Sequence, residues 1–217
     1  GGFTLPVALP TLAGAGRHCR IGHGMAEPAL KTEPALKLSY LTAGAGGMYC
    51  GSCLHDNTLA KGLHQLGVDV QLIPTYTPIR TDEEDRSIDR VFLGGLNVYL
   101  QQKVALFRYL PDFLDRWLDR PGLIRWVTAR GMETSASQLG ALAVSMLQGS
   151  EGCQRKEVRR LCRWMQGQPK PDLVNLSNIL IGGCVHSLKK SLQVPIVVTL
   201  QGDDIFLENL VEPYRGR

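Results

Sequence analysis

The chain has 217 residues, of which 44% are hydrophobic and 20% charged, so it is neither fibrous nor wholly disordered. A chain of this length buries about 70% of its unfolded surface on folding, and therefore needs neither disulfides nor a metal to hold a core. The net charge of +4 is too small to indicate a nucleic-acid-binding protein, and no apolar run approaches the ~20 residues of a membrane-spanning helix.

The six cysteines show no regular spacing, which favours reduced thiols and a cytoplasmic location over a disulfide-rich secreted protein. No charged region precedes the small and apolar residues at the N-terminus, so this pattern does not indicate a signal peptide. We interpret residues 1–34 as a leader or a poorly ordered segment. The folded domain is expected over residues 35–217.

An α/β pattern opens the folded domain. Residues 36–42 have the length and apolar character of a strand, and a glycine-rich loop over residues 43–47 follows. Leucines that recur on one helical face predict a helix ending near Gly67, where a C-terminal glycine is expected. Residues 68–73 predict a second strand, which Pro74 is expected to end. Together these elements predict a β-α-β unit.

The middle of the chain predicts a helical insertion. After a charged loop, residues 87–93 have the pattern of a short strand. Residues 96–126 have amphipathic helical spacing interrupted by prolines. A further helix, capped by Thr134 or Ser135, is expected to run to about Gln148.

A basic helix is predicted next, over residues 156–165. Five basic residues lie on it or beside it: Arg155, Lys156, Arg159, Arg160 and Arg163. A basic helical face of this kind is usually solvated, and contact with phosphate groups or with a membrane surface is the alternative.

The last third of the chain returns to an α/β pattern. Residues 172–176 predict a buried strand, residues 179–192 a helix, and residues 196–200 the strongest strand of the chain. Strands that alternate with helices predict a parallel sheet covered by helices on both faces, as in a Rossmann-like fold.

The glycine-rich loop after the first strand is the first candidate site. Glycines between a strand and a helix let backbone N–H groups approach an anion at the helix N-terminus. The loop is not a dinucleotide-binding fingerprint, because Tyr49 stands at the third glycine position. It is not a Walker A loop, because Ser52 stands where the lysine is required. Phosphate binding and a plain tight turn both stay open.

Cys50 and Cys53 form a CxxC pair at the start of the predicted helix. A helix N-terminus lowers the pKa of a thiol, so redox chemistry is one interpretation. Zinc binding would need two further ligands, and neither a second CxxC nor an HxxxH motif accompanies His55 and His64. No metal site is therefore expected. The alternative is that the pair only supplies small residues at a tight helix start.

Polar residues stand at three further points where ligands commonly bind. Asp56 and Asn57 open the helix after the loop, where they can cap it or hold a sugar hydroxyl. Ser177 and Asn178 follow one strand, and residues 201–204 follow another. In open α/β sheets, ligands bind at this carboxyl edge of the strands.

In their order and spacing, these segments resemble the N-terminal half of the GT-B-fold glycosyltransferases of family four, formerly called group one. The resemblance covers residues 36–210. It rests first on residues 38–42 followed by Gly46, Gly47 and Met48, and on the L…L…LG..V pattern of residues 57–70. Residues 92–99 add a third segment. Residues 172–178 are similar to the family's PDxVxxxN strand, and residues 195–204 are similar to its VPxVVTxHGxD strand. Residues 46–57 and 94–103 resemble an uncharacterised bacterial subgroup.

The resemblance implies two Rossmann-like domains that face each other across a cleft. The N-terminal domain would bind mainly the acceptor, and a C-terminal domain would bind a nucleotide-sugar donor without a metal or other cofactor. This chain would be the acceptor-side domain of a retaining, hexosyltransferase-type enzyme. The donor-binding domain would be absent, and the chain would be inactive alone. The acceptor would be a glycan, a lipid or a small molecule. Nucleic acid is not expected, and any membrane contact would be peripheral, at the inner face.

The resemblance also assigns roles to individual residues. Gly46, Gly47 and Met48 would lie at the donor diphosphate, and Gln201 and Asp204 would stand at the catalytic positions. The acceptor would be bound by Asp56, Asn57, Asn97, Ser177 and Asn178.

Gln201 departs from the family, which usually has histidine at this position. Glutamine forms hydrogen bonds but does not titrate, so it cannot carry a proton in the reaction. A binding or regulatory module that keeps the fold without catalysis is the alternative that this substitution favours.

Overall fold

Four parallel strands carry the fold: β1 (Lys37–Ala43), β2 (Asp69–Thr75), β3 (Leu173–Leu176) and β4 (Ile196–Val198). They pair in the order β2-β1-β3-β4. The structure is a computed structural model that describes residues 35–45, 48–103 and 136–216. All of these residues belong to the second of the two units into which the chain divides, Pro34–Arg217.

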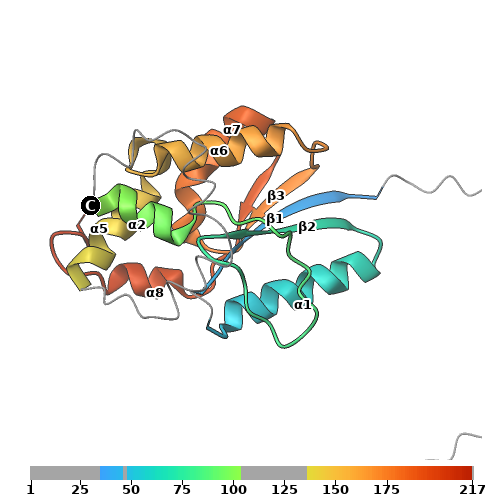
Figure 1. The fold of residues 1–217 in the computed structure, drawn as a ribbon, viewed down its shortest axis with the longest axis horizontal. Coiled ribbons are helices and arrows are strands. Elements are labelled where there is room, and N and C mark those ends of the chain that lie inside the picture. Colours follow the sequence, from blue (N-terminus) through green and yellow to red (C-terminus); the bar gives the residue numbers. More distant parts are fainter. Residues whose placement is uncertain (1–34, 46–47, 104–135, 217) are drawn as a thin grey trace, which may run out of the picture. The chain divides into compact units, whose positions relative to one another are not determined.

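Helices cover both faces of this sheet. They are α1 (Gly51–Gln65), α2 (Gly95–Lys103), α5 (Ala136–Leu147), α6 (Arg155–Gln166), α7 (Val185–Leu192) and α8 (Asp203–Glu208), with 3-10 turns at Gly149–Glu151 and Ile179–Cys184. Figure 1 shows α1 on one side of the sheet and α6 and α7 on the other. The described residues are therefore consistent with the expected α/β fold of Rossmann-like type.

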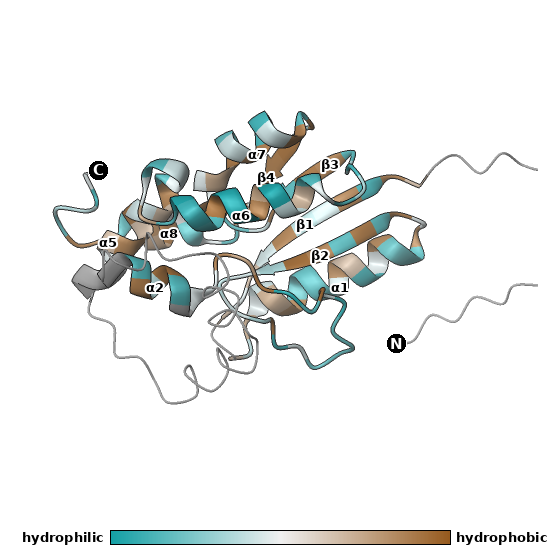
Figure 2. Ribbon diagram, turned by 45° about the horizontal axis from the view of Figure 1, so that its top comes forward, coloured by the Kyte–Doolittle hydropathy of each residue, from teal (hydrophilic) through white to brown (hydrophobic). Residues whose placement is uncertain are grey.

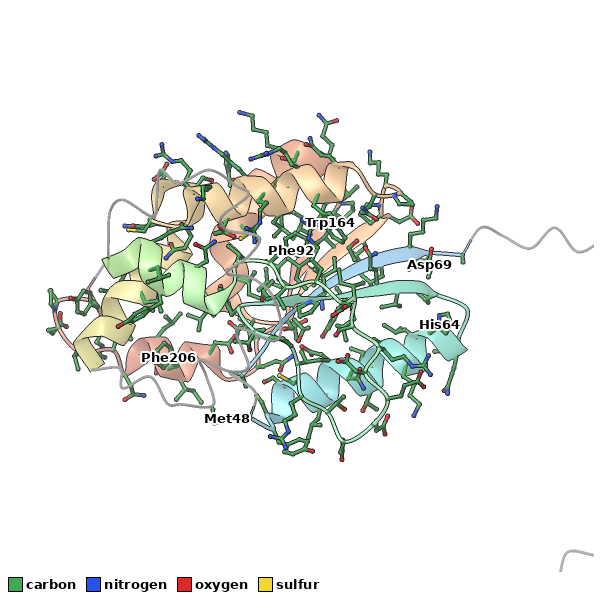
Figure 3. All side chains as sticks on the ribbon, in the orientation of Figure 1. Met48, His64, Asp69, Phe92, Trp164 and Phe206 are labelled. Carbon is green, nitrogen blue, oxygen red and sulfur yellow. The ribbon has the colours of Figure 1, made fainter. Side chains whose placement is uncertain are left out.

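The alternation of side chains along the strands explains why the sheet has two apolar faces. Leu38 and Tyr40 of β1 point toward α1, whereas Leu41 belongs to the cluster under α6 and α7. In Figure 2 hydrophobic and hydrophilic segments alternate along β2, and α6 is largely hydrophilic on the side in view. On the α6 side, the rings of Phe92 and Trp164 pack with their centroids 4.7 Å apart (Figure 3).

The order of the strands reverses between β1 and β3. From β1 the chain crosses to β2 on one side, whereas β3 and then β4 are added on the other side. In open α/β sheets this reversal leaves a crevice at the carboxyl ends of the two central strands. The fold therefore directs attention to the loops that follow β1 and β3.

The predicted β-α-β unit is confirmed, but Pro74 does not end its second strand. Pro74 lies inside β2, paired with Thr42 of β1. Proline is tolerated because β2 is an edge strand of the described sheet, so its missing N–H breaks no bond to a second strand. The segment predicted as a strand over residues 87–93 covers that outer edge through isolated bridges only, at Ser87 and Phe92.

The C-terminal elements also differ from the sequence-based expectations. Residues 196–200 predict the strongest strand, but β4 is a three-residue edge strand in which Val197 is 49% exposed. The predicted helix over residues 179–192 begins with a 3-10 turn before α7. Arg160, assigned to a basic face, is buried against Glu157 at 2.9 Å. The arginines left exposed on α6 are Arg155, Arg159 and Arg163.

The helical insertion between β2 and β3 is confirmed at both of its ends. The prediction over residues 96–126 is met by α2 up to Lys103, and its remainder lies outside the described residues. The helix predicted to end near Gln148 is α5. None of the helices in the described segments is long and apolar enough to cross a membrane.

The packing of α5 against the 3-10 turn after β3 gives a test of this arrangement. A Cβ atom on Gly183 would lie 2.0 Å from the carbonyl oxygen of Met146, which is a backbone atom that cannot move aside cheaply. We expect Gly183→Ala to lower the free energy of unfolding by roughly 1–3 kcal/mol through overpacking.

Urea denaturation of the wild type and of this variant measures the effect. The matched control is Gly62→Ala in α1, where an added Cβ meets nothing within 4 Å. Because alanine is the better helix former, the control should gain about 0.5–1 kcal/mol. An unchanged midpoint for Gly183→Ala would show that α5 does not pack on the turn in this way.

Candidate functional site

The candidate site lies at the carboxyl ends of the strands, where the strand order reverses. Ser177 N–H donates to the carbonyl oxygen of Leu41 at 2.9 Å, so the chain leaves β3 directly beside the end of β1. Three segments meet in this region: the loop after β1, the first turns of α1 and the loop after β4.

Gly44, the first glycine of the loop after β1, is explained by packing. Its N–H donates to Thr75 at 2.9 Å, and a Cβ on Gly44 would lie 2.0 Å from the carbonyl oxygen of Thr77. Only glycine permits this close approach to the loop after β2. Gly46 and Gly47 lie outside the described residues, so their contact with a donor diphosphate stays a prediction.

Asp56 is the centre of the site. Its side chain is fully buried in the second turn of α1. One carboxylate oxygen accepts from the Tyr40 hydroxyl at 2.8 Å, and the other accepts from the Thr42 hydroxyl at 2.6 Å. Gln201 Nε2 donates to the first oxygen at 3.0 Å. A buried carboxylate is tolerated only with such partners, so Asp56 ties β1 and the loop after β4 to α1.

Tyr40 is held as a proton donor to this carboxylate. Burial raises the pKa of the Tyr40 hydroxyl well above its ordinary value, and the negative charge and hydrogen bond of Asp56 raise it further. The hydroxyl therefore keeps its proton at every pH at which the protein is handled.

His55 brings an exposed titratable group to the same carboxylate. Its Nδ1 lies 3.1 Å from Asp56 Oδ1, and its side chain is 58% exposed. A carboxylate that accepts from Nδ1–H orients the ring and leaves Nε2 free to exchange a proton with a ligand. His55 is thus the exposed side chain in contact with this buried carboxylate.

Sequence analysis selected Asp56 and Gln201 separately, and the structure brings them into contact. It did not select His55, Tyr40 or Thr42. A usable signal was present, because Tyr40 and Thr42 carry hydroxyl groups two residues apart on one strand, and so face the same side.

The residues after β3 and β4 form a second polar contact. Asn178 Nδ2 donates to Asp203 Oδ1 at 2.8 Å, and the Ile179 N–H donates to the other Asp203 oxygen at 2.9 Å. Asn178 Oδ1 accepts from the Leu180 N–H at 2.7 Å and caps the 3-10 turn. These side chains lock the two loops to each other. Ser177, which directly precedes Asn178, is also buried.

The side chains of Asn57 and Asn97 form hydrogen bonds that join separate segments of the fold. Asn57 Nδ2 donates to the carbonyl oxygen of Glu84 at 3.0 Å, and its Oδ1 accepts from the Arg86 N–H at 2.9 Å, which fixes the charged loop after β2. Asn97 Nδ2 donates to the buried Glu157 at 2.9 Å and joins α2 to α6. Neither side chain contacts Asp56 or Gln201 in these bonds, and their proposed role in acceptor binding stays a prediction.

The last two predicted residues flank the site. Met48 is 67% exposed just before α1 (Figure 3), where a ligand can reach it. Asp204 is the second residue of α8, and its side chain is not among those described. Among the described residues, no group of three or more His, Cys, Asp and Glu side chains is arranged to hold a metal ion.

Comparisons of this chain with protein-family models, with curated proteins and with solved structures found no match. The site is therefore interpreted from its own geometry.

The buried carboxylate predicts a large cost for removing its charge. In Asp56→Asn, an amide N–H₂ replaces an oxygen that now accepts from protein donors, so at least one of those bonds is lost. We expect the free energy of unfolding to fall by about 2–4 kcal/mol.

Chemical denaturation with Asp69→Asn as the matched control measures this cost. Asp69 is exposed at the start of β2, and the same change there should alter stability by less than about 0.5 kcal/mol. Equal effects at both positions would mean that Asp56 does not hold the site together.

Proposed function

We propose that this chain is the acceptor-side domain of a GT-B-type glycosyltransferase, which moves a sugar from a nucleotide-sugar donor to an acceptor. The observation that carries the proposal is the hydrogen bond between Gln201 and the buried Asp56. It joins the loop after β4 to α1 at the reversal of strand order, the point at which α/β sheets bind ligands.

In this proposal, the start of α1 receives the donor diphosphate. Loss of a nucleoside diphosphate develops negative charge on its phosphates. The N–H groups and the dipole at a helix N-terminus stabilise such charge, and no acidic side chain stands in the first turn of α1 to oppose it. Gly46, Gly47 and Met48 would provide the close backbone approach.

Gln201 and His55 would face the sugar. Gln201 Nε2 is held by Asp56, so its side-chain oxygen is oriented and accepts from a sugar hydroxyl. His55, fixed by the same carboxylate, would supply the proton-transfer group that glutamine cannot. Asp204 would stand close behind, at the start of α8.

The donor itself would be held by a second domain outside these residues. Transfer would then proceed with retention of the sugar's configuration, as the resemblance implies, and this domain alone would be inactive. The acceptor would be a glycan, a lipid or a small molecule. The arginines exposed on α6 would provide any contact with a membrane surface.

A binding or regulatory module without catalysis is the second candidate. The observation that favours it is that Gln201 offers no titratable atom at the position where the family has histidine.

Calorimetry with UDP and GDP, on the full protein that the coding sequence specifies, distinguishes the two candidates. A glycosyltransferase should bind one of them, and Gly47→Val should weaken that binding at least about tenfold, or ~1.4 kcal/mol. The reason is that a branched side chain blocks backbone approach to the phosphates.

Gly62→Val in α1, the helix that follows this loop, is the matched control, since an added Cβ there meets nothing within 4 Å. It should bind as the wild type does. Equal affinities of the wild type, Gly47→Val and Gly62→Val would mean that the glycine-rich loop does not contact the phosphates. Absence of binding by the wild type would favour the binding module.

A further inference from the structure

Two cysteines of unequal exposure stand at the start of α1. Cys50 is the N-cap residue, with extended backbone angles, and it is partly exposed. Cys53 is in the first turn and fully buried, and its Sγ donates to the carbonyl oxygen of Ala43 at 3.3 Å. Both are free thiols. The Cys50 thiol is thus accessible to a reagent, whereas the Cys53 thiol, three residues later, is buried.

The surroundings of the two thiols shift their pKa values in opposite directions. Burial alone would raise the pKa of Cys50, but the backbone N–H groups of Cys53 and Ser52 outweigh it, and the pKa of Cys50 lies below its ordinary value. Burial, then the neighbouring Cys50 and then Asp56, raise the pKa of Cys53 to about 12. The accessible sulfur is the more easily ionised, and the buried one keeps its proton.

From this arrangement we propose that Cys50 and Cys53 form a thiol–disulfide exchange site that reacts with low-molecular-weight disulfides of the glutathione class. This activity lies beyond the proposed function and does not require a donor domain. The pair belongs to one helix start, and none of the sugar-transfer steps uses it.

The reaction proceeds in two balanced steps. The Cys50 thiolate attacks one sulfur of the disulfide, whose S–S bond breaks and releases one thiolate. Cys53 then loses its proton to solvent and attacks the Cys50 sulfur. The Cys50–Cys53 bond forms and the second small thiolate leaves. Both released thiolates take up a proton from solvent, which balances the two protons lost by Cys50 and Cys53. In sum, two protein thiols are oxidised and one small disulfide is reduced to two thiols.

Oxidation of Cys50 and Cys53 would remove a hydrogen bond at the carboxyl end of β1. The Cys50–Cys53 bond removes the Sγ–H that now donates to Ala43, the last residue of β1. The loop that begins at Gly44 would then lose one of its attachments. Oxidation would alter the same loop that the proposed function assigns to the diphosphate.

Peptide mapping of the whole chain tests the proposal. The protein is incubated with oxidised glutathione, blocked with iodoacetamide and digested with trypsin. Cleavage after Lys37 and Lys61 yields one peptide that holds Cys50 and Cys53 and no other cysteine. In the wild type this peptide should lose two hydrogens and carry neither glutathione nor a carbamidomethyl group. In Cys53→Ser it should carry one glutathione on Cys50.

Alkylation rates measured against pH provide a second readout. Cys50 should reach half of its maximal rate at a lower pH than N-acetylcysteine amide measured in parallel, and Cys53 should not react in the folded protein. Cys153 is the internal control, because it is also partly exposed and has no cysteine three residues away. It should form at most a mixed disulfide.

Either of two results would overturn the proposal. One is a wild-type peptide in which glutathione stays on Cys50, or in which neither thiol reacts. The other is a Cys50 midpoint at or above that of the free reference thiol. Both readouts use the wild-type protein, so a folding defect in Cys53→Ser would not affect them.

Discussion

The buried carboxylate of Asp56 is the constraint on which the rest of the site depends. A charge with no exposed surface needs several donors, and they come from separate elements: Tyr40 and Thr42 from β1, and Gln201 from beyond β4. These bonds fix the start of α1 against the central strand and against a loop more than 140 residues later in the chain, since the Asp56–Gln201 contact spans 145 positions. Without the charge, the donors on the strands and on the loop would lose their common acceptor.

This arrangement also explains how the fold could serve a transferase. The strand order reverses between β1 and β3, and in open α/β sheets ligands bind at the carboxyl ends of the strands at such a reversal. The start of α1 brings backbone N–H groups to this edge, while Gln201 and His55 bring hydrogen-bonding side chains. Backbone donors for phosphate beside hydrogen-bonding side chains for hydroxyls are what a nucleotide sugar requires. The same helix start holds the Cys50–Cys53 pair, so redox chemistry and ligand binding would meet at one loop.

The sequence predicted the elements better than it predicted the contacts of the site. Apolar patterning located β1, α1, α6 and β3. The buried face of α1 was not the predicted one, because the helix buries Asp56 and Asn57 while Leu59 and Leu66 are exposed. Apolar patterning failed at Pro74 and at β4, because edge position depends on which strands pair, and local pattern does not encode this. Polar residues at a helix start and after a strand identified Asp56 and Gln201 but could not pair them. Asn97 looked equally suitable, yet it is used to join α2 to α6 through Glu157, a contact that only the packing of the insertion creates.

A double-mutant cycle between Asp56→Ala and Gln201→Ala tests the central claim most directly. The free energy of unfolding is measured for the wild type, both single variants and the double variant. If Asp56 holds the loop after β4, the two effects should be non-additive by about 1–2 kcal/mol, because either change removes the same bond. Additivity within about 0.5 kcal/mol would contradict the account, since it would mean that the loop after β4 is positioned independently of the buried carboxylate.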